Sequence, residues 1–200
     1  MNIRRLLRSS AAVILAVITA AALGACSSEE EVTVPDFEQS YWGDNRTTVT
    51  ETETSDYAYA SDEIILYEKT ENGTECEVYY LFTDGLLTSG EIHYGTGDEG
   101  ISISDAITLY TTLRESITAT YGDPDDQGLV DGYKRIDETS AYYEEHKDES
   151  DDQRFQYGFL SYDTKWTTDR STMQLLMEYD SGAVKLVFYA SQNSTTESSS

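Results

Sequence analysis

The sequence predicts an α+β protein in which an antiparallel sheet of about six strands carries one main helix on one face. Three observations support this class. Short runs alternate apolar and polar residues, turn sequences such as Asn72-Gly73 separate the runs, and one long segment repeats its apolar residues at spacings of three and four. The 16 Tyr, 5 Phe and 2 Trp supply enough large apolar side chains for a core.

The first half of the sheet is predicted to be an antiparallel meander. Its strands are expected at 64–69, 76–83 and 86–94. Asn72-Gly73 and Asp84-Gly85 are the turn sequences that join them as hairpins. Cys76 lies on the apolar face of the second strand, so we expect its thiol to be buried and unreactive.

The main helix is predicted over residues 103–121. Its apolar face is formed by Ile103, Ala106, Ile107, Tyr110, Leu113, Ile117 and Tyr121. Ser102 or Ser104 can cap its start, because a serine hydroxyl accepts a hydrogen bond from a free backbone amide. Gly122 and Pro124 end it, since glycine adopts positive φ readily and proline cannot continue a helix.

The second half of the sheet follows an acidic, loop-rich segment at 123–152. Its strands are expected at 155–162, 172–179 and 184–189. A tight turn at 180–182 joins the last two strands. A short helix is also expected near the start, at 45–54.

The N-terminus has the parts of an export signal. Three arginines stand in the first eight residues, and an apolar run of 13 residues follows at 11–23. A membrane span needs about 20 apolar residues, so the run is too short to be one. Leu23-Gly24-Ala25-Cys26 then resembles the bacterial lipobox, in which a peptidase cuts before a lipid-modified cysteine.

This resemblance implies that the mature protein begins at Cys26 and is held by lipid on the extracytoplasmic face of a cell membrane. The expected regions are a signal peptide at 1–25, a polar tether at 26–34, a single α+β domain at 35–190 and a disordered tail at 191–200. Ser27 is compatible with an outer membrane in a two-membrane bacterium or with a Gram-positive plasma membrane.

The chain is strongly acidic. Its 13 basic and 38 acidic residues give a formal net charge of −25, and loss of residues 1–25 would remove three arginines to leave −28. Such a surface excludes nucleic acid as a partner, because phosphate is bound by Lys and Arg. It favours cations and basic partners.

Several motifs carry a second resemblance. They are Trp42-Gly43-Asp44, the run Tyr79-Tyr80-Leu81-Phe82-Thr83-Asp84-Gly85-Leu86, Tyr121-Gly122-Asp123-Pro124, and Trp166. Over about residues 41–190 the chain resembles small lipoproteins of Gram-positive bacteria. More distantly, its order of elements is similar to beta-lactamase-inhibitor-like and outer-membrane-assembly α+β modules. The resemblance implies protein binding without catalysis, although one strong helix departs from their tandem pattern.

Asp123, Asp125 and Asp126 partly match a calcium-binding loop. Position 12 of such a loop is a bidentate carboxylate, but here it is Lys134, with Asp131 as the alternative ligand. We therefore expect no metal and no cofactor, with these three aspartates as the only candidates. The dense acidic run Glu144, Glu145, Asp148, Glu149, Asp151 and Asp152 is interpreted either as a solvated loop or as a docking patch for a basic partner.

Catalytic motifs are missing from the sequence. His93 and His146 fall in different predicted elements, and no Gly-x-Ser-x-Gly turn is present. We expect no enzyme activity, with a paired-carboxylate glycosidase as the one catalytic alternative.

The surplus of tyrosines suggests a binding face. Tyr67, Tyr79, Tyr157, Tyr162 and Tyr189 cannot all enter one core, and tyrosine is favoured in binding surfaces. These residues either cover the wet face of the sheet or bind an envelope protein or cell-wall glycan. The hypothesis is a lipid-anchored, non-catalytic binding module of the cell envelope. The alternative is a cation- or small-ligand-binding lipoprotein that uses 123–152.

Overall fold

A computed structural model describes residues 33–97, 100–131, 141–146, 148–158 and 160–194. The chain divides into two units, 1–33 and 34–200, and the fold belongs to the second. The predicted signal peptide, Cys26 and nearly all of the predicted tether lie outside the described residues.

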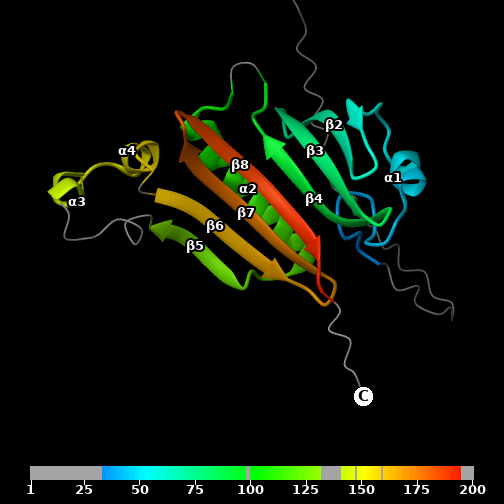
Figure 1. Ribbon diagram of the computed structural model, residues 1–200. Coiled ribbons are helices and arrows are strands. Elements are labelled where there is room, and N and C mark those ends of the chain that lie inside the picture. Colours follow the sequence, from blue (N-terminus) through cyan, green and yellow to red (C-terminus); the bar gives the residue numbers. More distant parts are fainter. Residues whose placement is uncertain (1–32, 98–99, 132–140, 147, 159, 195–200) are drawn as a thin grey trace, which may run out of the picture. The chain divides into compact units, whose positions relative to one another are not determined.

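Eight strands of the described part form one sheet in the order β1-β2-β3-β4-β8-β7-β6-β5, and every pairing is antiparallel. The strands are β1 (Tyr59–Ala60), β2 (Ile64–Glu71), β3 (Thr74–Thr83), β4 (Leu86–Tyr94), β5 (Asp126–Asp131), β6 (Leu160–Thr167), β7 (Ser171–Asp180) and β8 (Ala183–Gln192). Two four-stranded meanders meet where β4 pairs with β8 (Figure 1). The predicted α+β class with an antiparallel sheet is confirmed.

The predicted hairpin turns explain the register of the meanders. Asn72-Gly73, Asp84-Gly85 and Ser181-Gly182 all have positive φ at both residues, between 50° and 91°. Two-residue turns of this kind match the right-handed twist of the strands that they join.

Four helices lie among the described residues. They are α1 (Arg46–Thr52), α2 (Ile103–Tyr121), α3 (Ala141–His146) and α4 (Asp151–Gln156). Ser102, not Ser104, caps α2, since its hydroxyl accepts from the backbone amide of Asp105 at 3.1 Å. Asn45 caps α1 in the same way, which confirms the short helix expected there. None of these helices is both long and apolar enough to cross a membrane.

The core lies on one face of the sheet, here called the inner face. Its central row runs in register through Tyr67, Val78, Ile92, Phe188 and Leu175, on five adjacent strands. All five are at most 8 % exposed. Helix α2 packs on the inner face over β7 and β8, behind them in the view of Figure 1.

The inner face of the other half-sheet is covered by residues 34–53, which we call the strap. Phe37 of the strap packs against Tyr80 and Phe188, with ring centroids 5.3 Å and 6.4 Å away. Val49 of α1 is fully buried. The strap also bonds to β4, because the amide of Gly43 donates to the carbonyl of Leu87 at 2.9 Å.

Four details differ from the sequence prediction. The sheet has eight strands rather than about six, because β1 and β5 were not predicted. The strand expected at 155–162 is wrong at its start: Phe155 belongs to α4, and β6 begins at Leu160. The segment 123–152, expected to be loop-rich, contains β5 and α3. At the other end, β8 continues to Gln192, beyond the domain limit expected at 190.

Candidate functional site

The five tyrosines predicted as a binding face do not share one face. Tyr67 and Tyr162 point to the inner face, where Tyr67 is 1 % exposed and Tyr162 packs against Tyr110 and Phe155. Tyr157 follows α4 and is 47 % exposed. Only Tyr79 and Tyr189 lie on the opposite, outer face. The predicted set is therefore wrong as a surface, because strand parity divides its members.

The outer face carries two rows of side chains across six strands, of which most are polar or aromatic and three are aliphatic. One row is Leu66, Tyr79, Glu91, Tyr189, Gln174 and Lys165. The next is Glu68, Glu77, His93, Val187, Leu176 and Asp163. Figure 1 looks onto this face, and α2 lies behind the sheet. The outer face is thus the candidate surface for a partner.

Acidic residues concentrate at the β2–β4 end of this face. We call Glu68, Glu77, Tyr79, Glu91 and His93 the outer acidic patch. Glu68 and Glu77 are direct cross-strand partners. Like charges placed directly opposite each other destabilise a sheet, and only His93, the cross-strand neighbour of Glu77, offers a basic group within the patch.

Internal contacts hold the aromatic part of the patch in place. The Tyr79 hydroxyl donates to Glu77 Oε2 at 2.6 Å, and His93 Nε2 lies 2.8 Å from Glu91 Oε2. The rings of Tyr79 and His93 are 5.0 Å apart. Burial, the hydrogen bond to Glu77 and the negative charges of Glu77 and Glu91 raise the pKa of Tyr79 to about 12. The phenol therefore stays neutral, and the patch presents carboxylates around an aromatic ring.

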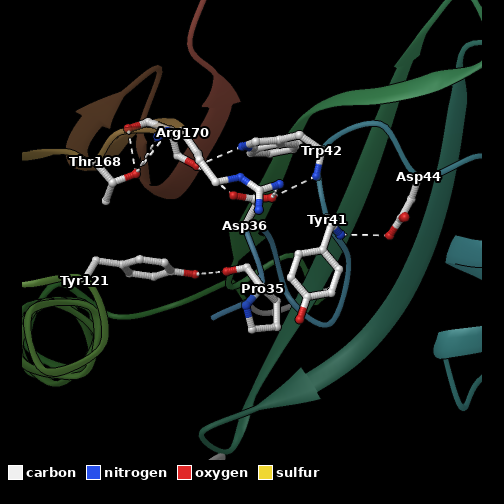
Figure 2. A network of polar contacts seen from close by, with 9 residues as sticks. Pro35, Asp36, Tyr41, Trp42, Asp44, Tyr121, Thr168 and Arg170 are labelled. Atoms are coloured by element: carbon white, nitrogen blue, oxygen red, sulfur yellow. Dashed lines mark hydrogen bonds and ion pairs between the residues drawn. The ribbon is translucent and has the colours of Figure 1, made fainter. Parts of the chain in front are cut away.

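A second polar network joins the strap to the start of β7 (Figure 2). Asp36, which is 4 % exposed, accepts from Arg170 Nη2 at 2.6 Å and from the Trp42 amide at 2.9 Å. The Trp42 indole donates to Ser171 Oγ at 2.8 Å. The Tyr121 hydroxyl at the end of α2 donates to the Pro35 carbonyl at 3.0 Å. These contacts pair the polar groups of the network with one another, so the network fixes the strap to the start of β7 and the end of α2.

A third cluster lies half-buried between the strap and β2, and sequence reasoning missed it. Lys69 Nζ lies 2.8 Å from Glu53 Oε1 and 3.6 Å from Glu38 Oε2. Glu71 lies on the same face of β2 and is 8 % exposed. The sequence of β2 did contain a signal for this cluster. Alternate residues of a strand share a face, so Lys69 and Glu71 lie on the same inner face as Ile65 and Tyr67. We call Lys69, Glu38, Glu53 and Glu71 the Lys69 cluster.

The candidate calcium ligands do not form a loop. Asp123 and Asp125 are exposed, and the amide of Asp125 donates to the carbonyl of Lys165 at 2.8 Å. Asp126 and Asp131 are the ends of the extended strand β5, which pairs with β6. An EF-type site needs a curled loop of twelve residues. Within the described ranges, no group of three His, Cys, Asp or Glu side chains has the arrangement of a metal site.

The remaining candidates are distributed over separate elements. His93 is in β4, whereas His146 ends α3 and lies 2.8 Å from Glu149. In the acidic run, Glu144, Glu145 and Asp148 are exposed. Cys76 is a free thiol that is 1 % exposed, and burial, followed by the charges of Glu71 and Glu38, raises its pKa to about 12. The thiol thus lacks thiolate character at neutral pH.

Comparison with known proteins adds no assignment: no family model, curated protein or solved structure matches the chain significantly.

Proposed function

We propose that this protein is a lipid-anchored, non-catalytic binding module of the cell envelope, which holds a basic segment of another envelope protein on the outer face of its sheet. The observation that carries the binding proposal is the outer acidic patch. Its Glu68 and Glu77 stand opposite each other on adjacent strands, and Glu77 and Glu91 flank the Tyr79 ring.

A lysine or arginine of a partner fits this arrangement chemically. A cation over a tyrosine face gains from the ring quadrupole, and nearby carboxylates supply charge-assisted hydrogen bonds. Binding would also relieve the repulsion between Glu68 and Glu77. A formal net charge of −25 further favours encounter with a basic partner.

The anchor is proposed from the sequence. The sequence carries an export signal, formed by the basic start and the apolar run at 11–23, and a candidate lipidation site at Cys26. Lipid attached to Cys26 would keep the domain at the membrane.

The anchor is tested by removing the cysteine. Cys26→Ser should shift the protein from the membrane to the soluble fraction and abolish incorporation of labelled palmitate, because no sulfur remains to carry lipid. The matched control is Cys76→Ala, which removes the buried cysteine and should leave both readouts unchanged. Equal membrane retention of Cys26→Ser and the wild type would refute lipid anchoring.

The binding face is tested by crosslinking in intact cells. A photo-reactive amino acid replaces Tyr189 on the outer face or, as a control, Thr111 on the exposed side of α2. We expect a discrete crosslinked protein only from position 189. The double variant Glu77→Gln/Glu91→Gln should reduce its yield by roughly fivefold, as expected for partly exposed ion pairs.

Two results would count against this binding face. One is capture from position 111 alone. The other is a yield from position 189 that neither the double variant nor added salt reduces, because salt screens interactions between exposed charges. Glu115→Gln on α2 removes an exposed carboxylate outside the patch and should have no effect.

A further inference from the structure

The Lys69 cluster joins two separate parts of the strap to the sheet. Glu38 lies in the first turn of the strap and Glu53 directly follows α1, so both ends of the segment reach the same lysine on β2. The Tyr80 hydroxyl of β3 also donates to Glu53, and the Tyr94 hydroxyl of β4 donates to Glu71 Oε2 at 3.5 Å.

Charge is unbalanced in this cluster. Three carboxyl groups face one ammonium group, and the side chains of Lys69, Glu53 and Glu38 are only 18 %, 6 % and 20 % exposed. Burying uncompensated charge is costly, so a group in such a place tends to become neutral. With all three carboxylates ionised, the cluster would hold two unmatched negative charges.

Glu38 is held less closely by Lys69 than Glu53 is: its carboxylate lies 3.6 Å from Lys69 Nζ, against 2.8 Å for Glu53. The stronger ion pair therefore goes to Glu53, and Glu38 is left with less compensation for its charge. The titratable groups that interact with Glu38 are Glu53 after α1, Lys69 and Glu71 of β2, Cys76 and Tyr80 of β3, Tyr94 of β4, and Tyr121 of α2. Lys69 is the only cation of this set.

We infer that the Lys69 cluster is a proton-operated latch, which holds the strap on the sheet when Glu38 is protonated and loosens the strap when Glu38 ionises. The inference does not depend on the proposed partner or anchor, since it concerns the contacts of the strap with the sheet. It adds a regulatory property to the segment that directly follows residues 1–33 in the chain.

The direction of the pH effect follows from proton linkage. Burial is the main cause that raises the pKa of Glu38, to about 7; the negative charge of Glu71 adds to it, and Lys69 opposes it. Burial also raises the pKa of Glu71. The folded state therefore holds more protons than the unfolded chain between pH 4.5, the ordinary value, and about 7. Stability falls as pH rises through this window.

The first test measures the titration of Glu38 directly. Carboxyl carbon shifts of the full chain in non-ionic detergent are followed by NMR from pH 4 to pH 9. We expect a midpoint near pH 7, because burial raises the pKa of Glu38 to about 7. A midpoint for Glu38 in the ordinary range would overturn the latch, and this measurement requires no substitution.

The second test compares Glu38→Gln with the wild type. Glutamine keeps the size of the side chain but cannot ionise, so at pH 8 the variant should melt about 5 °C higher than the wild type and at pH 5 within about 1 °C of it. The matched control is Glu51→Gln, which removes an exposed charge from α1. It should show no such pH-dependent gain. Equal pH profiles for Glu38→Gln and the wild type would contradict the proposal.

A local readout separates a latch from a general loss of stability. Amide-exchange protection of residues 36–53, corrected for the pH dependence of intrinsic exchange, should fall from pH 5 to pH 8. Protection of the β7–β8 hairpin should stay constant. An equal loss of protection in the strap and in the β7–β8 hairpin would mean that the whole domain loses stability as pH rises. That result would contradict a local opening of the strap.

Discussion

Gly90 shows how a single residue determines how closely the strap approaches the sheet. It lies in β4 between Tyr80 and Ala190 on the neighbouring strands, with the Phe37 ring directly above it. A Cβ at this position would lie 2.3 Å from Phe37 Cε1. Glycine is needed here for space, since its backbone does not have positive φ.

Gly90→Ala is therefore expected to destabilise the domain. The added methyl group would push Phe37 away from Tyr80 and Phe188, and overpacking of a core typically costs about 1–3 kcal/mol. Thermal unfolding should show Tm lower by several degrees. Ser89→Ala, the neighbouring outer-face substitution, is the matched control and should have a small effect.

A double variant checks the cause. If the clash with Phe37 is responsible, Phe37→Leu combined with Gly90→Ala should lose less stability than the sum of the two single changes. Additive losses, or an unchanged Tm for Gly90→Ala alone, would show that the close approach is not what requires glycine.

At the scale of elements, the helices and turns that were predicted correctly are those whose conformation depends on residues close together in the sequence. The turns at Asn72-Gly73 and Asp84-Gly85, the helix at 103–121 and its glycine end depend on local φ preferences and on periodicity. The register of the β2–β3 hairpin also separates Tyr67 from Tyr79. Tyr67 lies opposite Val78, so the next residue, Tyr79, is on the other face of the sheet. The predicted turn at Asn72-Gly73 implies this register, but the prediction of a tyrosine face did not take it into account.

One missed element had a local signal. The apolar Phe155 suggested a strand, but Ser150 and Gln153 form a capping box that starts α4, and Phe155 then packs against Tyr162 and Tyr179. The Lys69 cluster was missed because it depends on distant residues. Two of its carboxylates come from residues 16 and 31 positions before Lys69, on a strap whose course no local pattern specifies.

Over the whole molecule, acidic charge dominates. The chain carries a formal net charge of −25, and among the described ion pairs Arg46–Asp62, Lys165–Asp163 and Lys185–Glu178 are at the surface. Such surface pairs contribute little to stability. Long-range repulsion therefore acts on the fold, and it is added to local repulsion between Glu68 and Glu77.

Salt should therefore stabilise the protein. Raising NaCl from about 10 mM to about 0.5 M shortens the Debye length from roughly 30 Å to a few ångströms and screens the repulsion. We expect Tm to rise by several degrees at pH 7, with KCl giving the same result because the effect is not specific to one cation. A lower Tm in salt would show that pairs such as Asp36–Arg170 outweigh the repulsion.

The network around Asp36 also has a consequence for the order of folding. Asp36 and Arg170 are 134 residues apart in sequence, whereas the β2–β3, β3–β4 and β7–β8 hairpins each close over a two-residue turn. Closing a long loop is entropically costly and slow, so local hairpins form before such distant contacts. During synthesis the strap emerges first, yet its partner in β7 emerges among the last residues of the sheet. The beginning of the domain is thus the part that docks last, and Trp42, whose indole bonds to Ser171, is the natural fluorescent reporter of that final step.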